Sequence, residues 1–254
     1  MVITADTPVR DIVLAYPGAI PILEQFGIDY CCGGNHSLAG ACTRRNHDVS
    51  VVIEELNHQP NNAATSEVYW NTAPLGDLIG HIVRKHHAFA RQHLNLAQEL
   101  ADRVERRHGP THPEIYKISE AIAAISAELT HHFSCEETVL FPHIEQLEKR
   151  GQSVVHPVFE NIQQPVTKMI MEHNQTGEEL RTLREATNDY VPPSDACTTF
   201  RALYRALEEL ERDLHRHIHL ENNILFPRAL KLEGEVPNGV SINTAASACR
   251  PYSD

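Results

Sequence analysis

Two segments of the chain share one pattern, which consists of a histidine, three residues, a glutamate and, four residues later, Leu-Phe-Pro. The first segment pairs His132 with Glu136, and the second, 85 residues further along, pairs His217 with Glu221. A spacing of four residues places the histidine and the glutamate on one face of a helix, about one turn apart. The pattern therefore predicts two helices that each present a His–Glu pair in the same direction.

The helix faces that carry these pairs are apolar. They also present Leu129, Phe133, Val139 and Leu140 in the first segment, and Leu214, Ile218 and Leu225 in the second. Burying histidine and glutamate among such side chains costs several kcal/mol unless they are paired or bind a metal. A surface ion pair between residues i and i+4 would contribute only a few tenths of a kcal/mol, and it does not explain why the pattern occurs twice. The repeat favours a buried metal site.

Helical periodicity extends over most of the remaining chain. Apolar positions recur with helical spacing in four long segments, which span about 75–107, 113–149, 158–187 and 196–231 and are separated by Gly- and Pro-containing turns. Alternating β-branched runs, the signal of strands, are absent from the sequence. Four long helices with short connections predict an all-α fold, an up-down-up-down four-helix bundle.

A different pattern precedes the bundle. Thr7-Pro8 is typical of a helix start, Pro17-Gly18 of a break, Gly27 of a helix end, and a last short helix is expected from about Ser50. The predicted divisions are a small helical module at 1–58, a polar linker at 59–72, the bundle at 73–232, and a disordered tail rich in Ser, Asn, Ala and Gly at 233–254.

Counting residues shows whether histidines on different helices can meet. His87 lies 22 residues before the first turn of the bundle and His132 lies 23 residues after it, so antiparallel helices rising about 1.5 Å per residue bring them level. His173 and His217 lie 20 and 24 residues from the turn that separates them. Each helix therefore supplies one histidine at a similar depth, although periodicity alone allows either His86 or His87 in the first helix.

The predicted ligand set contains four imidazoles and two carboxylates: His87, His132, Glu136, His173, His217 and Glu221. Six ligands exceed a tetrahedral zinc site, which takes four. They suit two non-haem iron ions, each held by two histidines and by one oxygen from each bridging glutamate. A bridging oxo or hydroxo group would leave each iron five-coordinate and open to a small ligand. Nitrogen and oxygen ligands without thiolate favour iron or manganese over copper(I).

Charge and hydrophobicity exclude several classes of partner. The formal net charge is −12, and an acidic surface repels both nucleic-acid phosphates and anionic membranes. The chain has no apolar run of the roughly 20 residues needed to span a bilayer, and its first residues lack the basic and apolar regions of a secretory signal. We therefore expect a cytoplasmic protein that binds neither nucleic acid nor membrane.

The adjacent cysteines Cys31 and Cys32 form a second candidate site. A disulfide between neighbouring residues closes a strained ring, so a stable structural disulfide is not expected. The functional interpretation is a labile dithiol that supplies electrons to the metal site or contacts metal in transit. The alternative is two small residues that fill a tight turn.

The motifs resemble those of the hemerythrin-like di-iron domain, and residues 1–231 resemble the repair-of-iron-centres family. The resemblance rests on the segment 29–34 (Asp-Tyr-Cys-Cys-Gly-Gly), on the two His-x-x-x-Glu motifs with Leu-Phe-Pro, on Glu172-His173, and on Leu-Glu-Asn-Asn at 220–223. It implies the same six ligands and favours His87 over His86. It also implies a cytoplasmic stress-response protein that restores iron–sulfur clusters damaged by nitrosative or oxidative stress.

Within this resemblance several functions remain open. The di-iron site could bind or reduce nitric oxide, or donate iron, with iron–sulfur proteins as clients. Alternatively, the bundle could be a scavenger or sensor that binds dioxygen or nitric oxide without turnover, although oxygen carriers of this type have five histidines and an aspartate. A third alternative is a helical adaptor with fortuitous histidines. A module that presents Cys31 and Cys32 to a neighbouring subunit would imply a homodimer.

Overall fold

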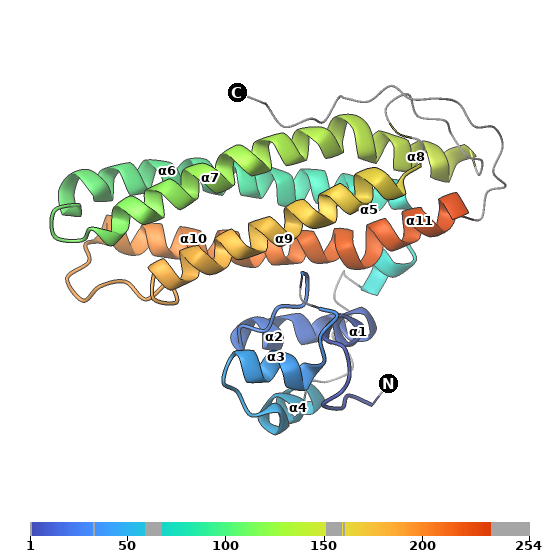
Figure 1. The fold of residues 1–254 in the computed structure, drawn as a ribbon, viewed down its shortest axis with the longest axis horizontal. Coiled ribbons are helices and arrows are strands. Elements are labelled where there is room, and N and C mark those ends of the chain that lie inside the picture. The colour runs from blue at the N-terminus through green and yellow to red at the C-terminus, as the bar shows by residue number, and fades with distance from the viewer. Residues whose placement is uncertain (1, 33, 59–67, 151–158, 160, 235–254) are drawn as a thin grey trace.

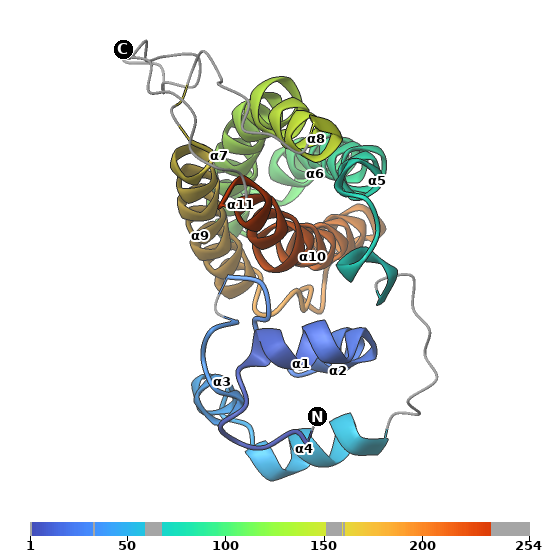
Figure 2. The same ribbon diagram turned by 90° about the vertical axis from the view of Figure 1, so that its right-hand side faces the viewer.

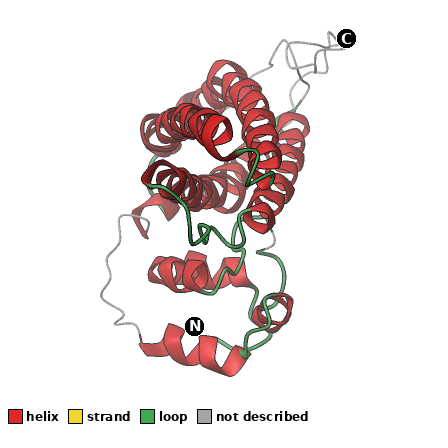
Figure 3. Ribbon diagram, turned by 90° about the vertical axis from the view of Figure 1, so that its left-hand side faces the viewer, coloured by secondary structure: helices red, strands yellow, loops and turns green. Residues whose placement is uncertain are grey.

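The computed structural model describes residues 2–32, 34–58, 68–150, 159 and 161–234. Of the predicted linker at 59–72, residues 68–72 are described, and Val68–Asn71 form the short helix η2; the rest of the linker lies outside the described residues, as does the predicted tail at 233–254 apart from its first two residues. Throughout the described part the chain consists of helix and loop, without a strand (Figure 3). No helix of the described part is long and apolar enough to cross a membrane. The all-α prediction is confirmed.

Four long antiparallel rods form the bundle (Figures 1 and 2). The first consists of α5 (Leu75–His81), η3 (Ile82–His87) and α6 (Ala88–His108), and the second of α7 (Glu114–Cys135), η4 (Glu136–Leu140) and α8 (Phe141–Arg150). The third is α9 (Gln163–Ala186), and the fourth consists of α10 (Thr198–His219), η5 (Leu220–Leu225) and α11 (Phe226–Gly234). This arrangement confirms the predicted up-down-up-down topology.

Three of the rods contain a π-helical segment, namely η3, η4 and η5. His87 is the last residue of η3, Glu136 is the first of η4, and Glu221 is the second of η5. Segments of this kind are rare and occur often at functional sites, because the wider turn changes the direction in which the following side chains point. Apolar periodicity predicted helix throughout these segments, and it did not distinguish π-helical from α-helical turns.

The third long helix begins later than its periodicity suggested. We expected a start near residue 158, whereas α9 begins at Gln163. Two side chains accept hydrogen bonds from the first amides: the Glu233 carboxylate accepts from the Ile162 N–H at 2.9 Å, and Asn161 Oδ1 accepts from the Gln164 N–H at 3.3 Å. The helix starts where its unpaired N–H groups find these acceptors.

The N-terminal module is built from α1 (Val9–Ala15), η1 (Pro17–Ala19), α2 (Ile20–Gln25), α3 (Leu38–Arg44) and α4 (Val49–His58). Gly27 ends α2 with a φ of +60°, a conformation that glycine adopts without strain. The module lies against the bundle on the side of α9 and α10 (Figure 1). It has its own apolar core, which includes Val9, Ile12 and Leu23.

Helix α10 holds the module against the bundle. Ile218, expected on the bundle's inner face, instead packs into the core of the module. The Arg216 guanidinium donates to both carboxylate oxygens of Glu24, at 2.8 and 2.9 Å. Asn223 Nδ2 donates to the carbonyl oxygen of Tyr30 at 3.1 Å. These contacts fix the segment that carries Cys31 and Cys32 beside the bundle.

Candidate metal centre

The six residues singled out from the sequence lie together inside the bundle. They form two groups, each able to surround one cation, and both groups contain Glu136 and Glu221. One group adds His87 and His217, and the other adds His132 and His173. All six side chains are buried, with exposed fractions between 0 and 2%. This burial distinguishes the six residues from a cluster of charged side chains on the surface, so they form a closed internal site.

The two oxygens of each glutamate face different groups. Oε2 of Glu136 lies 3.4 Å from His87 Nε2, while Oε1 lies 3.2 Å from His132 Nε2. For Glu221, Oε1 lies 2.9 Å from His217 Nε2 and Oε2 lies 3.1 Å from His173 Nε2. Each carboxylate can therefore offer one oxygen to each of two cations, as a bridge requires.

Acceptors outside the site orient three of the four imidazoles. The Nδ1–H group of His87 donates to Glu137 at 2.7 Å, and that of His132 donates to Glu172 at 2.8 Å. The Nδ1–H group of His173 donates to Asn222 Oδ1 at 2.8 Å. A proton on Nδ1 leaves the Nε2 lone pair of the neutral ring directed inward. Metal-binding histidines are almost always oriented in this way.

The spacing of the Nε2 atoms fits cations between them. Nε2 of His132 lies 3.0 Å from Nε2 of His173, and Nε2 of His87 lies 3.3 Å from Nε2 of His217. Facing lone pairs at such distances repel each other unless a proton or a metal lies between them. Two nitrogens bound to one metal at about 2.1 Å and at right angles lie about 3.0 Å apart. In addition, both carboxylate oxygens of Glu136 and Oε2 of Glu221 are buried without a hydrogen-bond partner among the described residues. The donor set fits metal ions.

Protons balance the charges of the site once metal has been stripped from the protein. Burial by itself lowers the pKa of His87, but Glu136 and Glu221 outweigh it and raise that pKa to about 9. Burial also opposes the charge on His132, yet Glu136 foremost raises its pKa to about 10. Burial and mutual repulsion raise the pKa of Glu136, but the histidines keep the pKa values of Glu136 and Glu221 below the usual carboxyl range. Two carboxylates thus face two imidazolium groups.

Metal binding is therefore expected to release protons. At pH 7.5, below the raised pKa values of His87 and His132, loading stripped protein with ferrous iron should release about two protons per chain. Affinity should rise with pH up to about 10, the pKa of His132, because fewer protons then need to be displaced. Proton release can be measured with an indicator dye in weakly buffered solution. Iron uptake without proton release would contradict this electrostatic description.

The adjacent cysteines lie at the edge of the site. Cys32 Sγ is 3.5 Å from the carbonyl oxygen of His173 and 3.5 Å from Cys31 Sγ. Both thiols are free. Cys31 is buried, and burial together with the neighbouring Cys32 and Asp29 raises the pKa of its thiol well above the ordinary value. Cys31 therefore stays protonated near neutral pH, and Cys32 is the more accessible thiol.

Gly34 allows the cysteine segment to fold back closely on itself. A β-carbon at this position would lie 2.7 Å from the carbonyl oxygen of Tyr30, which accepts the Asn223 hydrogen bond. We expect Gly34→Ala to displace that backbone and to lower the free energy of unfolding by about 1–3 kcal/mol. Urea denaturation compared with Gly40→Ala measures the effect, because a β-carbon there would meet only side-chain ends, Ser37 Oγ at 3.3 Å and Arg44 Nη1 at 3.9 Å. Equal stability of both variants would contradict it.

Sequence reasoning missed the residues that orient the imidazoles. Glu172 and Asn222 were noticed only as parts of a familiar pattern, and Glu137 was not assigned a role. Each of these residues is adjacent in the sequence to a candidate ligand, and this adjacency was the one signal that could have identified them. Adjacency does not reveal which histidine on another helix each residue contacts. His86, the alternative to His87, lies outside the site: its Nδ1 contacts Asp213 Oδ1 at 3.0 Å.

Comparison with known proteins places these observations in a family. Residues 78–229 match the model of the hemerythrin HHE cation binding domain, and residues 5–59 match a domain of unknown function, DUF542. Proteins named iron-sulfur cluster repair protein YtfE from Escherichia coli O157:H7 and from Escherichia fergusonii are each 36% identical to the chain over 226 residues, covering 89% of this chain and 97% of theirs. The matched cation-binding domain and the buried His/Glu cluster together support iron binding. The chain belongs to the hemerythrin HHE domain family and, within it, to the repair-of-iron-centres proteins.

Proposed function

We propose that the chain binds two non-haem iron ions, one held by His87 and His217 and the other by His132 and His173. Glu136 and Glu221 would each offer one oxygen to either ion, and an oxo or hydroxo group would complete the proposed centre. The observation that carries this proposal is that the two groups of ligand atoms share both glutamates, with different oxygens facing each group.

The proposed activity is the repair of iron–sulfur clusters damaged by nitrosative or oxidative stress in the cytoplasm. The name of the relatives, iron-sulfur cluster repair protein, supports this proposal. Bound iron would supply open coordination positions for nitric oxide or dioxygen and an exchangeable metal for an iron–sulfur client. The protein's own residues hold the imidazoles in one tautomer and keep the carboxylates ionised, and burial excludes bulk water from the site.

The N-terminal module contributes the thiols in this proposal. The proposed domains are the module at 1–58, the linker at 59–72 and the di-iron bundle at 73–232. Cys31 and Cys32 would act as redox or metal-transfer thiols, supported by the 3.5 Å contact between Cys32 Sγ and the His173 carbonyl oxygen. A homodimer, in which the module docks on a neighbouring subunit, is part of the same proposal.

Repair of a nitrosylated iron–sulfur protein tests the function. The iron-loaded chain should restore the client's activity, whereas Glu136→Leu should not, because it removes one bridge between the metals. Glu120→Leu, the same change at an exposed position of α7, serves as the control. Equal recovery with the wild-type chain and Glu136→Leu would reject the proposal. Repeated turnover of nitric oxide to nitrous oxide would distinguish reduction from binding alone.

A further inference from the structure

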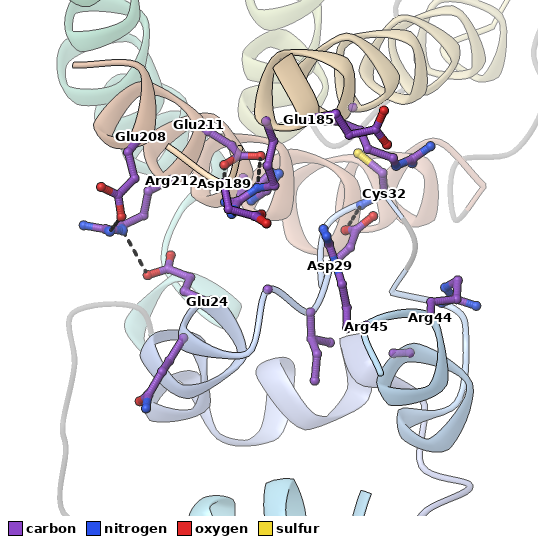
Figure 4. A pocket seen from close by; sticks show the side chains of 18 of the residues that line it. Glu24, Asp29, Cys32, Arg44, Arg45, Glu185, Asp189, Glu208, Glu211 and Arg212 are labelled. Atoms are coloured by element: carbon purple, nitrogen blue, oxygen red, sulfur yellow. Dashed lines mark hydrogen bonds and ion pairs between the residues drawn. The ribbon is translucent and has the colours of Figure 1, made fainter. Parts of the chain in front are cut away.

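A large cleft separates the N-terminal module from the bundle. Its volume is about 1200 Å³, and its walls are formed by the module on one side and by α9 and α10 on the other (Figure 4). Ligand sites for small molecules are typically about 300–1,000 Å³, so the cleft has room for a molecule of peptide size. It lies outside the buried metal centre, and of its lining residues only Cys32 has a place in the proposed function.

Ion pairs between charged lining residues fix the walls of the cleft. On the bundle side, Arg184 pairs with Glu211, and its Nη1 lies 3.2 Å from Asp189 Oδ1. Across the cleft, Arg216 pairs with Glu24 of the module at 2.8 Å. Because these groups already satisfy one another, they contribute to the shape of the cleft more than to the binding of a charged ligand.

Three other charged residues that line the cleft form no ion pair within the described part of the chain. Arg44 and Arg45 lie on the module side, at the end of α3, and Glu185 lies on the bundle side, on α9 (Figure 4). Two guanidinium groups are suited to carboxylates, which they can bind through two parallel hydrogen bonds. The Glu185 carboxylate is suited to an ammonium group. Outside the ion pairs, the module wall therefore offers the two arginines, with the Asp29 carboxylate beside Cys32, and the bundle wall offers Glu185.

The thiol of Cys32 lies in the same wall. It faces Gly177 of α9, where a β-carbon would lie in ordinary van der Waals contact with Cys32 Sγ, at 3.5 Å. Cys31 is buried and its thiol stays protonated. The accessible sulfur of the pair is therefore the one that borders the cleft.

We propose that this cleft binds a small zwitterionic thiol of peptide size, with its carboxylates on Arg44 and Arg45, its ammonium group near Glu185, and its sulfur at Cys32. In the oxidised form of such a ligand, the Cys32 thiolate attacks one sulfur of the disulfide. A bond forms between Cys32 and that sulfur, the ligand's own S–S bond breaks, and the departing thiolate takes up a proton. The reverse exchange with a second ligand thiol regenerates Cys32.

Binding and exchange at Cys32 do not require iron, whereas the use of this exchange to supply electrons rests on the proposed function. Glutathione disulfide provides the charged probe, and bis(2-hydroxyethyl) disulfide provides an uncharged one. Both are applied to the iron-loaded full chain and to the chain after chelation of iron. Intact mass and peptide mapping then give the rate of mixed-disulfide formation at each cysteine.

Cys197 is an internal reference, because it is an exposed free thiol outside the cleft. After normalisation to Cys197, we expect Cys32 to react at least about tenfold faster with glutathione disulfide than with the uncharged probe, with or without iron. Arg44→Glu combined with Arg45→Glu should abolish this preference, and Glu185→Lys should reduce it. Arg106→Glu combined with Arg107→Glu, an equal charge change on the exposed surface of α6, should leave it unchanged.

A preference at Cys32 no greater than that at Cys197, or one that survives reversal of Arg44 and Arg45, would overturn the proposal. A charge-reversed variant that had lost its fold would react faster with the uncharged probe at Cys32, so misfolding is distinguishable from loss of the binding site. Iron content measured in the same samples tests the metal site separately, because a chain without iron should still show the preference.

Discussion

A chain carrying Glu221→Leu is expected to retain less than about one iron ion after anaerobic reconstitution. Both oxygens of Glu221 face histidines, Oε1 lying 2.9 Å from His217 Nε2 and Oε2 lying 3.1 Å from His173 Nε2. Removing this carboxylate removes one ligand from each proposed iron ion and half of the negative charge that balances them. The affinity for a metal depends on the number and identity of its ligands, so the binding of both ions should weaken together. Iron analysis per chain measures the loss.

The fold of the variant is checked by circular dichroism before its iron is counted. Glu221 is fully buried beside His217 and His173, and removing one partner of a buried charge pair typically costs about 3–5 kcal/mol. Glu209→Leu, on the outer part of α10, is the matched control and should retain the iron of the unmodified chain. If Glu221→Leu bound as much iron as Glu209→Leu, the bridging role of Glu221 would be wrong.

Removing a hydrogen-bond acceptor that orients a ligand should lower the affinity for iron, although the ligands themselves are unchanged. Glu172→Leu removes the acceptor of the His132 Nδ1–H group, and Asn222→Leu removes that of His173. Loss of such partners typically lowers metal affinity by about 10–100-fold. We expect this decrease in competition with a ferrous chelator, at unchanged maximal iron content.

A conservative variant separates hydrogen bonding from packing. In Glu172→Gln the amide oxygen can still accept from His132, so most of the affinity should be retained. Asn222 has a second contact, because its Nδ2 group lies 3.5 Å from the carbonyl oxygen of Cys31. Asn222→Leu should therefore also loosen the cysteine segment, which faster alkylation of Cys31 would detect. Equal iron affinities of the Gln and Leu variants at position 172 would contradict the orienting role.

The helical bundle was predictable because its signal is local. The four-residue spacing of His132 and Glu136, and of His217 and Glu221, can be read from one helix at a time. Counting residues from each turn then placed four histidines at one depth. The direction in which each side chain points could not be predicted in the same way. Periodicity did not distinguish His86 from His87 as the ligand, because η3 is π-helical, ends at His87 and departs from the 3.6-residue repeat of an α-helix.

Contacts between distant segments could not be predicted from the sequence. Nothing in the sequence near Glu172 indicates that it contacts His132, 40 residues earlier. Ile218 fits the apolar pattern of the bundle, but it packs into the module, because the docked module offers it an apolar surface on the outside of α10. The cleft depends on the same docking. These features arise from tertiary packing, which the pattern along a single helix does not encode.

The di-iron proposal predicts a specific stoichiometry. The chelator-stripped chain is titrated anaerobically with ferrous iron, and bound metal is followed to saturation. Two overlapping ligand groups that share Glu136 and Glu221 predict a break at about two iron ions per chain. A break at one iron ion per chain or below would contradict the proposed di-iron centre.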